Sequence, residues 1–186
     1  MKYLFLFILI FQGIISSAQT LARDWNQKIE QEMSQFLDCA KNNPEISNDC
    51  SQSVGKTSKA IYRLNDFYNA KKSRFMVVSE IYGYLKSNQR WELLGQGYKQ
   101  DVLLSAQDLA NKNRAVVAVY LDETNLGQLA FILPGEVAPS GSWGLRVPNS
   151  AAFIMTAPEK SYVNKGISYA FPRKTMAEVY LFARKI

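Results

Sequence analysis

Histidine is absent from all 186 residues of the sequence, which removes the commonest general base and metal ligand from any site. Cysteine is scarce as well, since the chain has two, Cys39 and Cys50. A structural zinc ion takes about four nitrogen or sulfur ligands, so this set is too small for a zinc site. The sequence shows no calcium-loop signature, and the glycines at 95 and 97 lack the third glycine and flanking elements of a phosphate loop. We therefore expect no metal and no cofactor.

Long runs of basic residues are also lacking, although the net charge is +6. The densest cluster, KKSR at residues 71–74, is too short and isolated for a nucleic-acid-binding surface. We interpret it as a solvated loop, with mild attraction to an anionic cell wall or membrane surface as the alternative. The sequence thus predicts no nucleic-acid partner.

One segment is strongly apolar, and it lies at the N-terminus. Residues 1–2 give a positive start, residues 3–15 form an almost unbroken apolar run, and residues 16–18 are small. This order is typical of a signal peptide, and the run is short for a bilayer span. We expect residues 1–18 to be cleaved, leaving Gln19 first and no stable membrane anchor. The protein would then be exported, either to the periplasm or out of the cell; a retained membrane anchor is the alternative.

The remaining residues, 19–186, suit a single globular domain, because hydrophobic residues make up 47% and charged residues 20% of the chain. Apolar periodicity predicts four helices, at 21–40, from near Cys50 to about 65, at 75–86 and at 100–111. Strands are predicted at 115–121, 127–133, 151–156 and 178–184, with 167–171 as a further candidate, and loops at 91–98 and 136–148. Helices first and strands later indicate an α+β fold, with helices packed on one face of an antiparallel sheet.

Cys50 is the most informative position, because it stands where a polar loop meets a predicted helix. Asn48 and Asp49 before it are good helix-capping residues. The free amide groups and dipole of a helix N-terminus favour a thiolate, which is the nucleophile of many cysteine hydrolases. The alternatives are that Cys50 pairs with Cys39 or is simply a small buried residue.

A family resemblance attaches to this segment. Three motifs in order, NPE at 43–45, NDCS at 48–51 and VG at 54–55, resemble the nucleophile segment of NlpC-type, papain-fold peptidoglycan amidases. In that family an Asp-Cys-Ser step opens the helix, and a later strand starts with a Gly-His pair and an apolar run. Here the matching stretch is GQLAFILPG at 127–135, in which Gln128 replaces the histidine. The third polar residue of the family would be Asn149 or Ser150.

The resemblance implies a papain-like or NlpC-like α+β fold with Cys50 as candidate nucleophile and Asp49 and Ser51 beside the substrate. Glutamine at 128 can hydrogen-bond, but it cannot take up the thiol proton or protonate a leaving amine. A further ligand candidate is Trp143, in a loop rich in Gly and Ser, which could line a peptide groove or stack on a sugar ring. The alternative is that Trp143 anchors the core.

Three functions remain open on these grounds. The first is a catalytically degenerate relative of cell-wall amidases that binds peptidoglycan stem peptides, or a protein partner, in the ancestral cleft. The second is an active cysteine hydrolase of peptidoglycan amide bonds that uses Cys50 with a base other than histidine. The third is an exported binding or inhibitor module unrelated to enzymes, which would show an apolar surface elsewhere.

Overall fold

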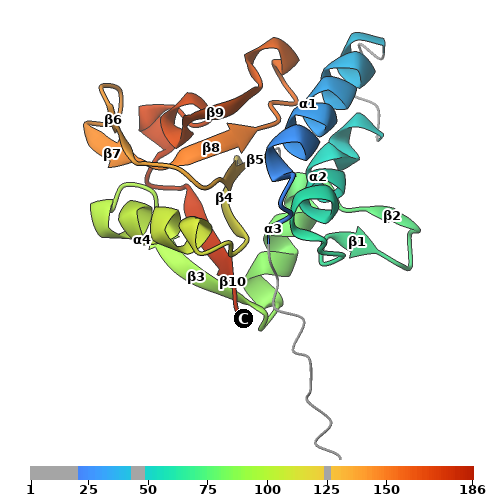
Figure 1. Ribbon diagram of the computed structural model, residues 1–186, viewed down its shortest axis with the longest axis horizontal. Helices are drawn as coiled ribbons and strands as arrows, with labels where there is room; N and C mark the ends of the chain where they lie inside the picture. The colour runs from blue at the N-terminus through green and yellow to red at the C-terminus, as the bar shows by residue number, and fades with distance from the viewer. Residues whose placement is uncertain (1–20, 43–48, 124–126) are drawn as a thin grey trace, which may run out of the picture.

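The computed structural model describes residues 21–42, 49–123 and 127–186 (Figure 1). The expected signal peptide, Gln19, the NPE motif and Asn48 lie outside these residues. The helices are α1 (Trp25–Asn42), α2 (Ser53–Tyr62), α3 (Val78–Ser87) and α4 (Gln100–Asn111), with single 3-10 turns η1 (Cys50–Gln52), η2 (Pro158–Lys160), η3 (Ile167–Tyr169) and η4 (Arg173–Thr175). Within the described part, no helix has the length and apolar character needed to cross a membrane.

Six strands form one antiparallel sheet in the order β3-β10-β4-β5-β8-β9. Their bounds are β3 (Trp91–Gln96), β4 (Val116–Leu121), β5 (Gly127–Ile132), β8 (Asn149–Ala152), β9 (Tyr162–Gly166) and β10 (Tyr180–Arg184). Two short hairpins stand apart, β1 (Tyr68–Asn69) with β2 (Arg74–Phe75), and β6 (Ala138–Ser140) with β7 (Leu145–Val147). The predicted α+β class with an antiparallel sheet is therefore confirmed.

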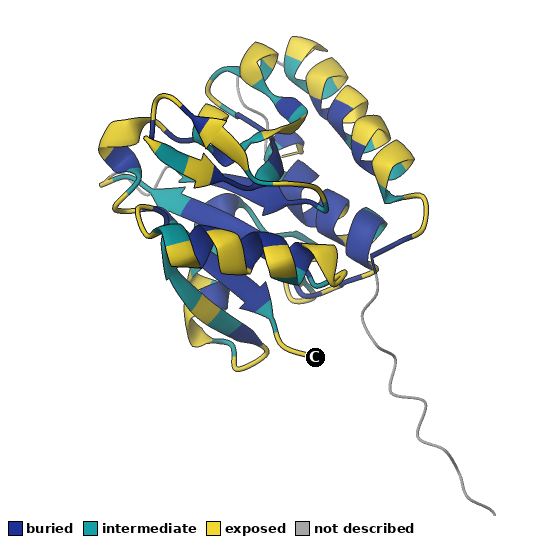
Figure 2. Cartoon of the chain, turned by 60° about the vertical axis from the view of Figure 1, so that its left-hand side comes forward, coloured by how far each residue is buried: buried dark blue, intermediate teal, exposed yellow. Residues whose placement is uncertain are grey.

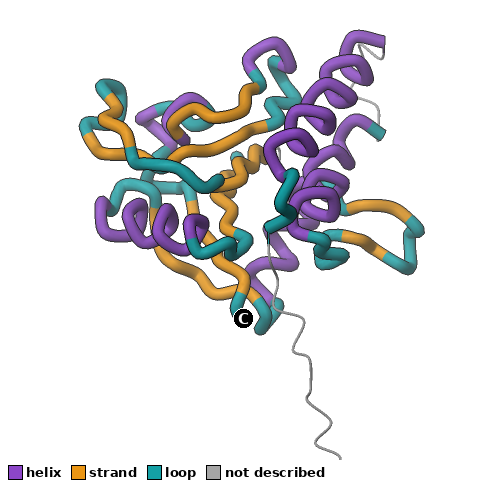
Figure 3. Tube along the Cα trace, in the orientation of Figure 1, coloured by secondary structure: helices purple, strands orange, loops and turns teal. Residues whose placement is uncertain are grey.

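The sheet is buried on both faces, so the prediction of helices on one face alone is wrong. Val117 and Phe131 face the core beneath α1, α2 and α3, whereas Val116 and Ile132 face the core beneath α4. Successive side chains of a strand point to opposite faces, so β4 and β5 contribute to both cores. Figure 2 shows these strands buried between helices with exposed outer faces, and Figure 3 shows α1 and α2 together beside the strands.

Several local predictions are corrected by long-range pairing. The predicted loop at 91–98 contains β3, which pairs with β10 across a register shift and passes through Gly95 at a φ of 143°. Only glycine adopts that φ readily, which explains why the segment looks like a loop. The predicted loop at 136–148 contains the β6–β7 hairpin, the predicted strand at 151–156 is β8, and the candidate strand at 167–171 is η3. The strand β9 was missed because Asn164, at a φ of 59°, interrupts its alternation.

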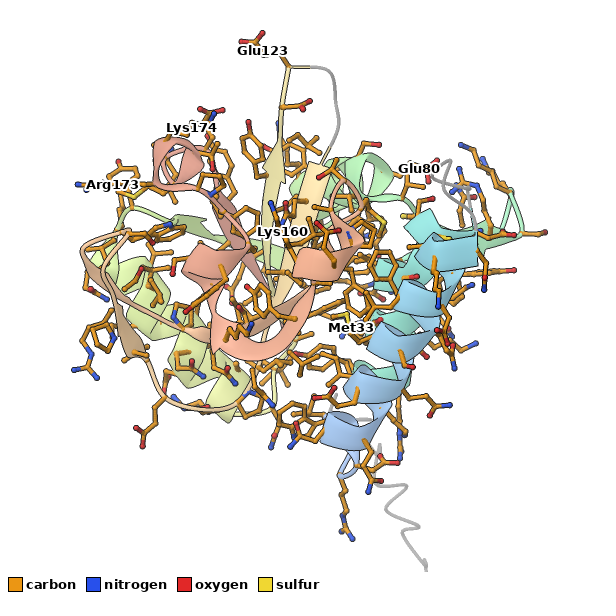
Figure 4. All side chains as sticks on the ribbon, turned by 90° about the horizontal axis from the view of Figure 1, so that it is seen from above. Met33, Glu80, Glu123, Lys160, Arg173 and Lys174 are labelled. Carbon is orange, nitrogen blue, oxygen red and sulfur yellow. A yellow bond between two sulfur atoms is a disulfide. The ribbon has the colours of Figure 1, made fainter. Side chains whose placement is uncertain are left out.

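The KKSR cluster at 71–74 is also more ordered than a solvated loop, because it forms the β1–β2 turn and binds α3. Lys72 Nζ lies 2.7 Å from Glu80 Oε1, and the Arg74 guanidinium donates to both Glu80 oxygens at 2.8 and 2.9 Å. The Arg74 guanidinium, assisted by Lys72, lowers the pKa of Glu80 to about 2. Glu80, labelled in Figure 4, also accepts a hydrogen bond from the Val77 backbone and so caps α3.

Candidate functional site

Cys50 lies at the start of η1, as the sequence predicts for a nucleophile, but its sulfur is bonded to Cys39. The two Cα atoms are 5.8 Å apart, and Cys50 is buried in the core beneath α1 and α2. A disulfide sulfur is not a thiolate and cannot attack an amide carbonyl. Of the alternatives left open, the structure shows pairing with Cys39, and in this state Cys50 is no catalytic nucleophile.

Gln128 is held on the other face of the sheet. It stands opposite Tyr120 in the β4–β5 pairing, and both side chains lie on the face covered by α4. Its amide donates a 2.8 Å hydrogen bond to the Ala170 carbonyl, which belongs to that same core. Cys50 belongs to the core on the opposite face. The sheet therefore separates Gln128 from Cys50, and the two do not share a cleft.

Asn149 and Ser150, the candidates for the third polar residue, make structural hydrogen bonds in β8. The Asn149 amide donates to the Pro134 carbonyl at 3.0 Å and to Asn164 Oδ1 at 3.1 Å. Ser150 is buried, and its hydroxyl bonds the Tyr162 hydroxyl at 2.9 Å. Burial raises the pKa of Tyr162 well above its usual range, so this pair stays neutral. Neither residue reaches the disulfide.

The three candidate binding residues are also dispersed. Asp49 is exposed and accepts a 3.2 Å hydrogen bond from the Gln52 amide, and Ser51 is half-buried in η1. Trp143 is fully buried, and its indole nitrogen donates 2.9 Å to the Phe171 carbonyl. Trp143 is therefore a core anchor, and its interpretation as a ligand-binding aromatic is wrong.

A different site is visible at one edge of the sheet. An open cavity of about 330 Å³ lies between α3 and the strands β3 and β10. We call this cavity the edge groove; its lining is mostly aromatic and aliphatic: Tyr82, Leu85, Lys86, Trp91, Leu93, Tyr180 and Phe182. Ligand sites are characteristically concave and mostly apolar with a few polar groups, and this cavity has that composition.

The edge groove is built by two elements that meet at Tyr82. Its ring centroid lies 6.4 Å from that of Tyr180 and 6.4 Å from that of Phe182, so α3 and β10 close the floor. Partial burial raises the pKa of Tyr82. The ammonium of Lys86 lies 5.2 Å from the Tyr82 ring centroid and supplies the charge at this site. Leu93 extends the apolar lining outwards and is 57% exposed.

The backbone beside this groove is an open strand edge. Among the described strands, β3 has one neighbour, β10, so its other side carries backbone groups without a strand partner. Trp91 and Leu93, two residues apart, both line the cavity, as the period of a strand requires. Sequence reasoning missed this site because it placed 91–98 in a loop. The available signal was the WELL stretch, in which an exposed leucine and a buried tryptophan share one face.

No metal site is formed within residues 21–42, 49–123 and 127–186, where no three acidic or cysteine side chains gather. No family model matches the chain, and the search of curated proteins found no match either.

Proposed function

We propose that this protein is an exported, non-catalytic binding module that holds an extended peptide segment of a partner protein along strand β3. The observation that carries the proposal is the coincidence of an open strand edge with the edge groove on the face of the same strand. An extended peptide that adds to a sheet edge gains main-chain hydrogen bonds, and alternate side chains enter pockets on one face. This is the third of the functions considered from the sequence, with its apolar surface at β3.

The lining predicts the peptide's chemistry. Tyr82 and Tyr180, both half-buried, offer aromatic surface to an apolar side chain, and burial of one such side chain contributes about 2 kcal/mol. The Lys86 ammonium favours an acidic residue in the same peptide, since opposite charges steer association and fix register. A long exposed leucine on a sheet edge is otherwise an aggregation hazard, and a partner strand would cover it.

The absence of hydrolase chemistry is supported by the geometry of the cysteine. Cys50 is held in a disulfide, so it offers no thiolate, and Gln128, at the position of the family's histidine, lies on the opposite face of the sheet. Ancestry among the NlpC-type amidases stays a proposal based on the motifs at 43–55 and 127–135. If that ancestry holds, the binding surface is not the ancestral cleft.

Export is supported by two independent features. Disulfides form and persist in oxidising compartments, and the Cys39–Cys50 bond is one. The apolar run at 3–15 followed by small residues has the pattern of a cleaved signal.

The test is selection of linear peptides on purified residues 19–186 from a phage-displayed random library. We expect enrichment of sequences that alternate apolar residues and contain an acidic residue. Binding of an enriched peptide is then measured by fluorescence anisotropy with the wild type and with Leu93→Lys, which should weaken it at least about tenfold. The matched control is Leu104→Lys, because Leu104 is 44% exposed on α4 and away from the groove.

A second arm separates strand addition from simple apolar docking. N-methylation of the peptide at alternate residues removes the amide donors on one side of the strand. One of the two alternating patterns should abolish binding and the other should preserve it. Selection that enriches nothing, or peptides that bind Leu93→Lys as tightly as the wild type, would show that the edge groove is not the binding site.

A further inference from the structure

A second cavity lies at the other end of the sheet, against β9, whereas the edge groove adjoins β3. It has a volume of about 480 Å³ and lies between the β6–β7 hairpin and the junction of β9 with η3. Apart from Tyr169, its lining consists of small residues, both apolar and polar: Ala138, Pro139, Val147, Gly141, Gly166, Ser140, Ser142 and Ser168. We call it the hairpin pocket. No lining residue is charged, so the pocket presents hydroxyl groups, backbone, small apolar side chains and one aromatic side chain.

Three serine hydroxyls form an oriented array in the hairpin pocket. Ser140 Oγ donates to Ser168 Oγ at 2.9 Å, lies 3.1 Å from Ser142 Oγ, and accepts a hydrogen bond from the Trp143 backbone at 3.2 Å. A serine hydroxyl has one proton and two lone pairs. Because Ser140 gives its proton to Ser168, Ser142 must donate to Ser140, which is then saturated.

This arrangement fixes what the two outer hydroxyls offer a ligand. Ser168 keeps its own proton as a donor, and Ser142 keeps the lone pairs of its oxygen as acceptors. A donor and an acceptor held apart by a saturated serine match ligand hydroxyl groups, each of which both donates and accepts. An apolar ligand would desolvate these hydroxyls without replacing their hydrogen bonds, which is unfavourable.

An aromatic platform and a cation stand beside the hydroxyls. Tyr169 lines the hairpin pocket and is 68% exposed, the most exposed aromatic ring among the large exposed hydrophobic residues. The Lys165 ammonium lies 5.5 Å from the Tyr169 ring centroid and 6.0 Å from that of Tyr162. The Tyr162 and Tyr169 rings are 6.0 Å apart and T-shaped, so Tyr169 is supported from behind.

We propose that the hairpin pocket binds a pyranose ring that carries an anionic substituent. The apolar C–H face of a sugar ring stacks on Tyr169, its hydroxyl groups bond Ser142 and Ser168, and the anion lies near Lys165. A neutral ring would leave the Lys165 charge unused, and a bare inorganic anion would leave the Tyr169 ring unused. This inference goes beyond the proposed peptide binding, since it concerns a separate surface.

The test is an NMR titration of ¹⁵N-labelled residues 19–186 with four methyl pyranosides. Two are acidic, the glucuronide and the galacturonide, and two are their neutral counterparts, the glucoside and the galactoside. We expect an acidic pyranoside to shift the amide signals of Gly141, Ser142 and Ser168 with a dissociation constant in the millimolar range. Its neutral counterpart should bind about threefold more weakly, because a single exposed charge contributes modestly.

Variants separate the three contributions. Tyr169→Ala should weaken binding about tenfold, whereas Tyr68→Ala, at a ring 41% exposed on β1, should leave it unchanged. Lys165→Gln should remove the preference for the acidic sugar. Gly141 lines the pocket and an added Cβ there meets open space, so Gly141→Leu should be tolerated; we expect its side chain to obstruct the pocket and abolish the shifts.

The proposal is overturned if no pyranoside moves those amides up to about 50 mM. It is equally overturned if the acidic and neutral sugars bind alike, or if Gly141→Leu binds as the wild type does. The variant Leu93→Lys distinguishes this proposal from the proposed peptide binding. It should leave sugar binding intact while reducing peptide binding, so failure at one surface is distinguished from failure at the other.

Discussion

The disulfide between Cys39 and Cys50 joins the last turns of α1 to the start of η1, across a sequence separation of 11. Replacing both cysteines by alanine restores the entropy of the closed loop to the unfolded chain. In the chain-entropy account this lowers the free energy of unfolding by about 3 kcal/mol. Since Cys50 is also buried, loss of its sulfur adds a smaller packing cost. For a domain of this size, such a loss lowers the melting temperature by about 6 to 12 °C.

The measurement is urea unfolding of residues 19–186 followed by circular dichroism, with the oxidised wild type beside Cys39→Ala/Cys50→Ala. The control is the wild type in excess reductant, which should unfold at nearly the same midpoint as the double variant. Equal midpoints for the oxidised wild type and the double variant would refute the reasoning, because the bond would then not constrain the unfolded chain.

The same bond also determines whether Cys50 can act as a nucleophile in the native protein. Purified without reductant, the native protein should react with less than about a tenth of an equivalent of a thiol reagent, because a disulfide exposes no thiolate. The hydrolase hypothesis requires the reverse, namely rapid labelling of Cys50 and cleavage of peptidoglycan that Cys50→Ser abolishes. Stoichiometric labelling of the folded, unreduced protein would restore that hypothesis.

Three other perturbations have defined outcomes. Asp66→Ala should lower the free energy of unfolding by about 3 kcal/mol, because the nearly buried Asp66 carboxylate accepts a 2.6 Å hydrogen bond from Arg184, whose side chain would be left charged and mostly buried. Glu80→Gln should lower it by about 1 to 2 kcal/mol at pH 7. Because the folded-state pKa of Glu80 is lowered to about 2, its contribution is complete above its unfolded pKa and is lost as the pH falls towards 2, so the two proteins should converge there. N-terminal sequencing of the protein from its exporting cell should begin at Gln19.

Controls for these variants come from the same chain. Asp108→Ala removes an exposed ion pair with Lys112 and should change the free energy of unfolding by less than about 0.5 kcal/mol. An Asp66 variant as mild as this control would contradict the buried ion-pair argument. A difference between the wild type and Glu80→Gln that persists unchanged at pH 2 would contradict the assigned pKa. A mature N-terminus at Met1 would contradict signal cleavage.

The helices were predictable from the sequence because the apolar pattern that specifies each helix lies within its own segment. Apolar residues at spacings of three and four predicted α1, α2 and α4, and the run of β-branched residues at 115–121 predicted β4. Strand β3 was not predictable in this way. Its residues adopt a strand because β10, more than 80 residues later in the chain, pairs with them, for example Arg184 with Trp91. The local strand propensity of β3 does not depend on that distant partner, so it could not predict the pairing.

The prediction that Cys50 and Gln128 share a site failed for a more specific reason. Residues 129–133 are apolar at every position, so no alternation reveals which side chains face α1 and which face α4. The register of β5 against β4 settles this, and it puts Leu129 and Phe131 with Cys50 and puts Gln128 on the other face. A shift of one residue would have reversed the assignment. Segments that resemble a family's motifs can therefore occur in the right order while their side chains lie on opposite faces of a sheet.

This burial also limits where the two proposed ligands could be bound. Strands β4 and β5 have both faces covered and most of their hydrogen-bonding edges paired, so over most of their length they offer a partner no surface; a small cavity of about 170 Å³ lies at one end of them, beside Tyr120 and Gln128. Access remains at the two ends, where β3 and β9 are edge strands. The ends differ in chemistry, because large aromatic and aliphatic residues line the edge groove, whereas three serine hydroxyls, small apolar residues and one exposed ring line the hairpin pocket. Two surfaces of unlike chemistry at opposite edges suit a module that joins a polypeptide partner to a saccharide.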